Sequence, residues 1–257
     1  MTKVILSGCS GAMGRTITAL ARQDEDIKIV AGVDVVPNKE AGYPIFANIE
    51  DCDIDADVIV DFSRPDLLAD ILNYSEEREI PAVLCTTGYT DEQIGDILDS
   101  SKKTALLRSA NMSLGINTIL KLLADATKVL ASEGFDVEIV EKHHNQKVDA
   151  PSGTAIALAD AVKEASDRDY EYIYDRTSKS EKRSENEIGI SSVRGGTIVG
   201  DHDVIFAGSD EVITLSHRAY SKAVFGKGAL SAAKFMVGKP NGLYRSEEHT
   251  SELQSPD

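Results

Sequence analysis

The sequence predicts an α/β protein that combines a Rossmann-like, doubly wound parallel sheet with a second, α+β domain built on an open mixed sheet. In the first half, short apolar runs alternate with helical patterns, which is typical of a parallel sheet covered by helices. After residue 136, apolar runs follow one another with glycines between most of them, which indicates a sheet of another kind. A chain of 257 residues is long enough for two such domains.

The first half contains five short apolar runs that we interpret as strands. They occupy residues 4–6, 27–33, 58–60, 82–84 and 105–107. Apolar residues at helical spacing predict helices through Ile17 and Leu20, from Pro65 through Leu72, and from an N-cap at Thr90 through Leu98. The same period over residues 114–130 predicts one long helix.

The second half has a different pattern. Residues 137–140, 188–193, 197–206 and 211–216 are predicted strands, and residues 222–236 form a helix that resembles those of the first half. Residues 167–187 are rich in charge and tyrosine, so we expect a mobile loop there. A lid over the site is the functional alternative for this loop.

The last thirteen residues, 245–257, stand apart from the rest. Residues 245–255 read RSEEHTSELQS, which resembles the translation of a common sequencing-adapter oligonucleotide. We interpret 245–257 as a non-native tail joined after Tyr244 and expect it to be poorly packed.

Charge and composition exclude several functions. The formal net charge of −16 argues against a nucleic-acid partner, because phosphate backbones require basic patches. No apolar run approaches the ~20 residues that a membrane span needs, and the first apolar run is too short for a signal peptide. Three scattered cysteines show neither metal spacing nor a disulfide framework. We therefore expect a cytoplasmic protein without a membrane partner, in which a site for an anionic substrate gathers its positive charge locally.

A glycine-rich segment, Gly8 to Gly14, follows the first strand and opens a helix. Glycines there permit a tight turn and let backbone N–H groups approach a pyrophosphate at the helix N-terminus. Ser10 stands where the second glycine of the G-x-G-x-x-G pattern would be. A glycine turn that serves packing alone is the alternative.

Asp34 follows the second strand, twenty residues after Gly14. An acid at this place accepts hydrogen bonds from the adenosine ribose and repels the extra phosphate of NADP. Val35 offers no arginine to bind that phosphate, so we predict that NADH is preferred over NADPH, although the nearby Lys39 would weaken the preference. An ordinary loop residue is the alternative for Asp34.

Two further polar segments, residues 85–88 and 109–113, come directly after strands. Ligands of such sheets bind at this carboxyl edge, so both segments are candidate cofactor contacts. Simple turn chemistry explains both equally well at this point.

Residues 141–155 are the densest polar stretch and contain two of the five histidines. A metal site of Glu141, His143 and His144 is disfavoured because adjacent side chains on a strand point to opposite faces. No strained elbow surrounds Ser152, which argues against a serine nucleophile. Reduction of an unsaturated imine fits better, since hydride addition leaves an enamine that a histidine protonates while a lysine holds a carboxylate. A plain polar connection into a capped helix is the remaining alternative.

The same stretch resembles the dihydrodipicolinate reductase family. The family signature E-x-H-H-x-x-K-x-D-A-P-S-G-T-A is matched at every specified position from Glu141 to Ala155, and the agreement extends from Val4 to Tyr244. The resemblance implies reduction of hydroxytetrahydrodipicolinate to tetrahydrodipicolinate with NADH or NADPH and without a metal, in lysine and diaminopimelate biosynthesis. It also implies a small dicarboxylate substrate.

The resemblance implies roles for particular residues. His143 matches the proton donor and Lys147 a second catalytic acid, while His144, Gly153 and Thr154 match substrate contacts. The implied cofactor contacts are Gly8, Cys9, Ser10, Gly11, Ala12, Met13, Asp34, Cys85, Thr86, Thr87, Ser109, Ala110, Asn111 and Met112.

The resemblance also implies a domain organisation. Residues 1–113 and 222–244 would form the dinucleotide-binding domain, and residues 114–221 the substrate-binding and oligomerisation domain of a homotetramer. Ser10 and Cys85 stand where many relatives have glycine, and Val35 replaces the arginine of NADPH-using members, which puts only the cofactor preference in doubt. Two rivals stay open: a nucleotide-binding regulatory or scaffold protein without turnover, and a reductase of a different cyclic imine.

Overall fold

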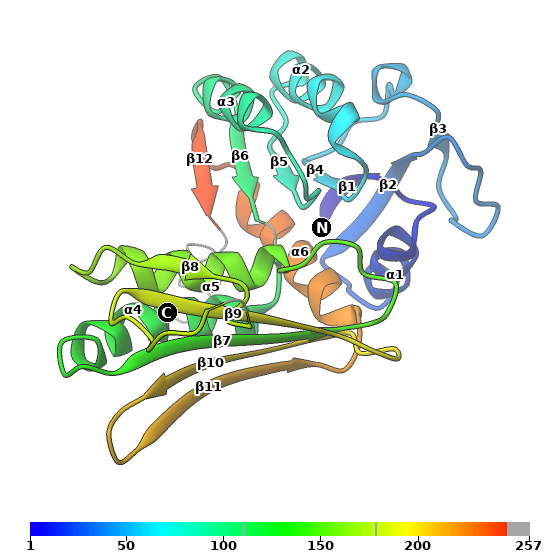
Figure 1. Cartoon of the computed structure of the whole chain (residues 1–257). Helices are drawn as coiled ribbons and strands as arrows, with labels where there is room; N and C mark the ends of the chain where they lie inside the picture. Colours follow the sequence, from blue (N-terminus) through cyan, green and yellow to red (C-terminus); the bar gives the residue numbers. More distant parts are fainter. Residues whose placement is uncertain (110, 178, 246–257) are drawn as a thin grey trace. The chain divides into compact units, whose positions relative to one another are not determined.

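The computed structural model describes residues 1–109, 111–177 and 179–245. The chain forms two compact units, one of Met1–Leu114 with residues 222–245, the other of Gly115–Ser221 (Figure 1). The first unit contains a parallel sheet covered by helices and the second a mixed sheet. The predicted fold class is therefore confirmed.

The sheet of the first unit has seven strands, all parallel, in the order β12-β6-β5-β4-β1-β2-β3. The chain begins in the middle of this sheet, builds outward through β2 and β3, and then returns to add β4 on the other side of β1. Ligands of doubly wound sheets bind at the carboxyl ends of the strands where the order reverses in this way. The strands are β1 (Thr2–Ser7), β2 (Ile27–Val33), β3 (Ile45–Phe46), β4 (Val58–Asp61), β5 (Ala82–Leu84), β6 (Ala105–Arg108) and β12 (Gly242–Arg245).

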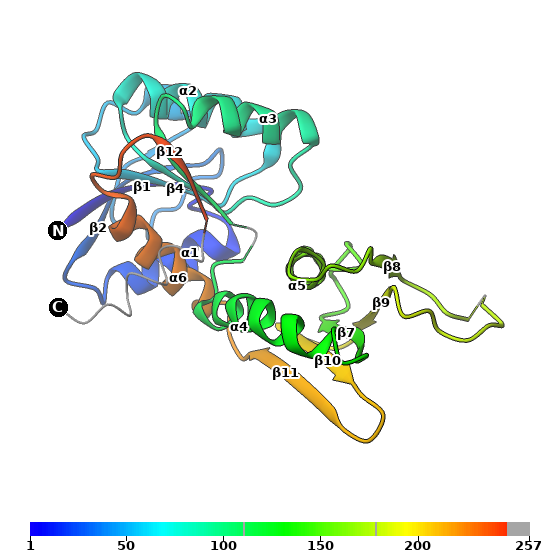
Figure 2. The ribbon, with the colours of Figure 1, turned by 90° about the vertical axis from the view of Figure 1, so that its left-hand side faces the viewer.

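Helices cover both faces of this sheet (Figure 2). Successive residues of β1 point to opposite faces, so Val4 and Leu6 pack with α1 (Ala12–Ala21) and α6 (Ala223–Met236). Ile5 lies on the other face, in the core that includes α2 (Leu68–Arg78) and α3 (Asp91–Ser100). The predicted N-cap at Thr90 is confirmed, because its side chain accepts the amide of Gln93 in a capping box. Two short 3₁₀ helices, Ile49–Asp51 and Pro65–Leu67, complete the unit.

The second unit has five strands in the order β11-β10-β7-β9-β8. The pairs β7–β9 and β8–β9 are parallel, while β10 is antiparallel to both β7 and β11. Apolar side chains of α4 (Leu114–Leu130) and α5 (Gly153–Glu164) form one core with the inward residues of the sheet. The strands are β7 (Asp136–His143), β8 (Glu171–Ile173), β9 (Glu187–Arg194), β10 (Gly200–Ala207) and β11 (Val212–Ala219).

The structure corrects the sequence analysis at several strands. A loop throughout 167–187 is wrong, because Glu171–Ile173 form β8 and pair with β9. The first strand of the second sheet does not end at residue 140 but continues to His143, since β9 and β10 pair with it up to that end. Two short strands, β3 and β12, were missed because they are stabilised by distant partners rather than by their own pattern. Arg245 belongs to β12 and not to a poorly packed tail, whereas Ala110 and residues 246–257 lie outside the described residues.

Candidate active site

The turn from β1 into α1 is built by closely packed glycines. Gly8 has a φ of +75°, and a Cβ atom added to it would lie 2.4 Å from the carbonyl oxygen of Phe62. A Cβ at Gly14 would lie 2.3 Å from the carbonyl oxygen of Gly8. Gly11 is the N-cap of α1 and provides no side-chain cap, so the first N–H groups of the helix are left for another acceptor. The turn therefore serves packing and also fits a pyrophosphate.

Substitution of Gly14 tests how tightly α1 is held against β1. Gly14→Ala is expected to destabilise the protein by about 1–3 kcal/mol, because the new methyl group overlaps backbone atoms that cannot move independently. Urea unfolding followed by circular dichroism measures this. Gly95→Ala within α3 is the matched control, since a Cβ there meets nothing within 4 Å and should not destabilise. Equal stability of the Gly14 variant and the wild type would contradict the prediction.

Asp34, the predicted ribose-binding acid, lies beside the glycine turn. Its Oδ2 accepts the amide of Ser10 at 2.9 Å and its Oδ1 accepts the amide of Val36 at 2.9 Å. Each oxygen keeps a second lone pair, so these bonds orient the carboxylate without excluding a ribose hydroxyl. The hydroxyl of Ser10 donates to the carbonyl of Val36 at 2.5 Å, which ties the turn to the loop after β2. The side chain of Val35 is 75% exposed beside this acid.

Thr86, which follows β5, is held by a buried carboxylate at the end of β4. Its hydroxyl donates to Asp61 Oδ2 at 2.6 Å, while the amide and hydroxyl of Ser63 donate to Oδ1 at 3.1 and 2.5 Å. Asp61 is wholly buried, and this burial raises its pKa although the hydrogen bonds oppose the shift. Asp61 lies within the range of the family resemblance, but its pattern in the sequence predicted no role of its own. The structure shows that it orients the loop of the predicted contacts Cys85, Thr86 and Thr87.

After β6, polar side chains bind backbone amides of their own segment. The amide of Asn111 donates to Ser109 Oγ at 3.2 Å, and the amide of Ser113 donates to Asn111 Oδ1 at 2.9 Å. The side chain of Met112 is buried in the core, as are those of Cys9 and Cys85. Cofactor contacts predicted at these three residues therefore have to use the backbone. The predicted contacts of the first unit follow the carboxyl ends of β1, β2, β5 and β6.

In the second unit, β7 brings an acid and a histidine to the same face. Glu141 and His143 are two residues apart on the strand, so both side chains point toward the buried face. Nδ1 of His143 lies 2.5 Å from Oε2 of Glu141. Glu141 was considered from the sequence only as a ligand of a disfavoured metal site, although the period of two along the strand already places it beside His143. Among the described residues, no group of three or more His, Cys, Asp or Glu is arranged to hold a metal ion.

Two residues that the sequence analysis did not single out as site residues complete this cluster. Arg194 at the end of β9 donates to both carboxylate oxygens of Glu141, at 2.8 and 2.7 Å. His202 of β10 is buried, and its ring packs edge to face against His143 with centroids 5.2 Å apart. Burial, with the nearby His143, lowers the pKa of His202 to about 3, so it is neutral at pH 7. Alternate residues of β10 are buried, among them Val204 and Phe206. The same period of two could have identified His202 as a buried residue.

Lys147 lies in the loop after β7 and is paired with an acid of the same motif. Its Nζ donates to Asp149 at 2.7 and 2.8 Å, and its amide donates to the carbonyl of His144 at 3.2 Å. Burial would raise the pKa of Asp149, but the hydrogen bond and charge of Lys147 lower it. Asp149 therefore holds Nζ of Lys147 in place at a partly open position.

Helix α5 begins directly after this loop. The hydroxyl of Ser152 accepts the amide of Ala155 at 3.2 Å and lies 3.1 Å from Nε2 of His202. Because Ser152 is 2% exposed, its hydroxyl acts as a helix cap rather than as an accessible nucleophile. Gly153 is exposed, and a Cβ there would meet nothing within 4 Å, while the adjacent Thr154 is buried. The amide of Gly153 has no acceptor within the helix, so this end is suited to a carboxylate.

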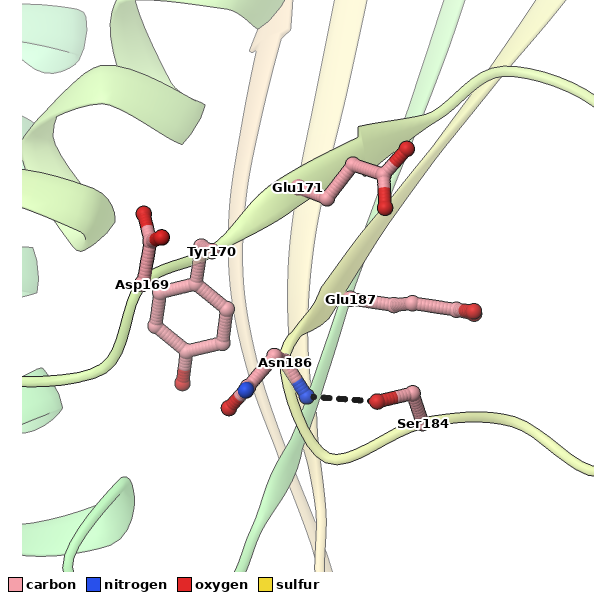
Figure 3. A pocket seen from close by; sticks show the side chains of 6 residues that line it. All are labelled: Asp169, Tyr170, Glu171, Ser184, Asn186 and Glu187. Atoms are coloured by element: carbon pink, nitrogen blue, oxygen red, sulfur yellow. Dashed lines mark hydrogen bonds between the residues drawn. The ribbon is translucent and has the colours of Figure 1, made fainter.

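A separate cavity of about 530 Å³ lies around β8 and the start of β9 (Figure 3). It contains none of the predicted site residues. Asp169, Glu171 and Glu187 line it, so its charge disfavours an anionic substrate. The other lining residues are Tyr170, Ser184 and Asn186.

The first unit has a glycine turn and an acid of the kind that binds a dinucleotide. The second unit has a histidine, a lysine and an open helix start. Together these features define the class of protein, which is an NAD(P)H-dependent oxidoreductase with a Rossmann-like unit. The family model of the dihydrodipicolinate reductase N-terminus matches residues 2–112, and that of the C-terminus matches residues 115–249. The chain belongs to the dihydrodipicolinate reductase family.

Relatives agree with this assignment over nearly the whole chain. The 4-hydroxy-tetrahydrodipicolinate reductase of Clostridium novyi is 51% identical over 248 residues, which are 96% of this chain and 98% of the relative. That of Caldanaerobacter subterraneus is 48% identical over the same shares. The dipicolinate-bound dihydrodipicolinate reductase from Paenisporosarcina sp. TG-14 superposes with a TM-score of 0.77 at 25% identity, covering 95% of this chain and 97% of that one. None of the described helices is both long and apolar enough to cross a membrane.

Proposed function

We propose that this protein reduces 4-hydroxy-tetrahydrodipicolinate to tetrahydrodipicolinate, in lysine and diaminopimelate biosynthesis. The 4-hydroxyl group leaves as water, and the hydride and a proton add to the unsaturated imine that remains. The observation that carries the proposal is the cluster of the second unit, where His143, Lys147 and the open start of α5 lie within one short segment. A dicarboxylate needs local positive charge in a chain of net charge −16, and Lys147 with the N-terminus of α5 supplies it.

Each predicted site residue has a distinct role in the proposed reaction. The glycine turn, Asp34 and the loop of Thr86 hold NADH or NADPH, which supplies a hydride when bound. His143 donates a proton to the electron-rich product of hydride addition. Lys147 holds a substrate carboxylate and acts as a second acid, while His144, Gly153 and Thr154 contact the substrate.

A coupled assay tests the proposal. The substrate is generated enzymatically in the cuvette, and the absorbance of NADH is followed after addition of the protein. A fall in absorbance that requires the generated substrate supports the proposal. NADH binding without turnover would instead indicate a regulatory or scaffold protein, and turnover only with another cyclic imine would indicate a different reductase. Retention of both His143 and Lys147 favours an active enzyme over a protein that has lost turnover.

We propose further that NADH is the preferred cofactor, because an acid at the position of Asp34 repels the extra phosphate of NADP and Val35 offers no cation to bind it. Val35→Arg is expected to raise kcat/KM with NADPH relative to NADH by about tenfold or more, since an arginine–phosphate pair is strong. Steady-state kinetics with both cofactors measure the ratio. Val129→Arg, at an exposed position of α4, adds the same charge elsewhere and is the control. A ratio unchanged from that control would contradict the preference at this position.

The remaining proposals concern assembly and location. We propose a cytoplasmic homotetramer in which residues 114–221 bind substrate and form the interfaces, and residues 1–113 with 222–244 bind the dinucleotide. Exposed apolar side chains on the edge strand β11, Val212 and Ile213, support an interface on this sheet. Analytical ultracentrifugation of the full chain tests the tetramer.

A further inference from the structure

Glu141 is the most enclosed charged side chain of the second unit's cluster, and the proposed reaction leaves it without a role. The residue is 0% exposed. Its carboxylate accepts from Arg194 at 2.8 and 2.7 Å, from the amide of Ser152 at 3.2 Å, and lies 2.5 Å from Nδ1 of His143. One carboxylate thus joins the proposed proton donor, the residue that caps the substrate helix, and an arginine from another strand.

The surroundings keep this carboxylate ionised. Burial by itself would raise the pKa of Glu141, but hydrogen bonds from His143, Arg194 and Ser192 hold it well below its usual range. Arg194 also donates to the carbonyl of Asp149 at 2.7 Å, so it fastens Glu141 and the loop of Lys147 together. A bidentate pair of a partly buried arginine with a buried carboxylate fixes the orientation of the carboxylate as well as balancing its charge.

We infer that Glu141, held by Arg194, is a positioning residue that selects the tautomer of His143. An ionised carboxylate can only accept, so Nδ1 of His143 carries a hydrogen and donates it to Glu141. The transferable proton of the imidazolium then lies on Nε2. When His143 gives that proton to the substrate, Nε2 keeps its electron pair, Nδ1 keeps its hydrogen, and Glu141 receives no proton. This inference rests on the proposed function only for the identity of the proton acceptor.

The other neighbours of His143 do not compete for this role. The ring of His202, on β10, packs against the ring of His143, but His202 is neutral at pH 7. Nε2 of His202 is engaged with the hydroxyl of Ser152. Lys147 is paired with Asp149 rather than with Glu141. Within the described part of the chain, Glu141 is the anion in contact with His143.

Glu141→Gln tests the inference, because it removes the charge and nearly keeps the shape. The expected result is a fall in kcat of about 10²-fold with unchanged KM for NADH, since an amide no longer dictates which nitrogen of His143 is protonated. Glu141→Asp, which retains the charge, should recover part of the lost kcat. Nitrogen NMR of histidine-labelled protein should show a hydrogen on Nδ1 of His143 in the wild type and a mixture of tautomers in Glu141→Gln.

Glu138→Gln is the matched control. Glu138 lies on the same strand and is also paired with an arginine, Arg183 at 3.0 Å, but it points to the opposite face, so its variant should keep full activity. If the single variant does not fold because Arg194 is left unpaired, Glu141→Gln combined with Arg194→Gln removes both charges and should show the same kcat loss. A kcat within about twofold of wild type in a folded Glu141 variant, or a wild-type His143 with its hydrogen on Nε2 alone, would overturn the inference. If the wild type does not turn over the substrate, the proposed function fails, while the NMR signal of His143 still decides the role of Glu141.

Discussion

His143→Gln is expected to lower kcat by about 10²- to 10⁴-fold, the range that a positioned general acid contributes. Glutamine fills nearly the same space and can still donate to Glu141, but it cannot give up a proton at neutral pH. The change therefore removes the proton donor while keeping the contact of 2.5 Å that holds the side chain in place. Steady-state kinetics with enzymatically generated substrate provide the measurement.

The binding of NADH is the internal control for this variant. The predicted cofactor contacts belong to the first unit, whereas His143 belongs to the second, so the Kd for NADH should not change. Fluorescence of bound NADH measures it. A variant that keeps more than about half of the wild-type kcat would show that another group donates the proton.

Lys147→Ala is expected to lower kcat/KM by about 10²- to 10³-fold, with kcat falling and KM for the substrate rising together. The lost charged hydrogen bond to a carboxylate accounts for a factor of about ten to a hundred, and the loss of a nearby acid accounts for the rest. Folding should be little affected, because the partner Asp149 is 60% exposed and returns to water when the lysine is gone. Kinetics and thermal unfolding of the same preparation measure both effects.

Lys142→Ala is the matched control for Lys147→Ala. Lys142 is also paired with an aspartate, Asp203 at 2.6 Å, but it lies on the face of β7 opposite to His143. The control variant should lose no more than a small part of kcat/KM. Equal kinetics of the Lys147 variant and the wild type would remove Lys147 from the proposed mechanism.

Several strands and helices of both units were predictable from the sequence because their signals are local. Residues 27–33 and 82–84 were predicted as strands with the bounds that the structure shows, and the helix at 114–130 likewise. Buried parallel strands are short runs of apolar residues, and amphipathic helices repeat with their own period, so neighbouring residues carry the information. β3, β8 and β12 lacked such patterns and depend on pairing with a distant strand.

The sequence by itself determined the family, the two-unit α/β architecture and the segment in which the chemistry is proposed. Only the tertiary structure decided how the charges within that segment are arranged. Glu141 and Arg194 are 53 positions apart, and the parallel register of β7 and β9 brings their side chains together. His202 reaches His143 in the same way, through the antiparallel pairing of β10 with β7. A carboxylate on a strand looks the same in the sequence whether it meets water or a buried arginine, because its partner is chosen by sheet register rather than by its neighbours along the chain.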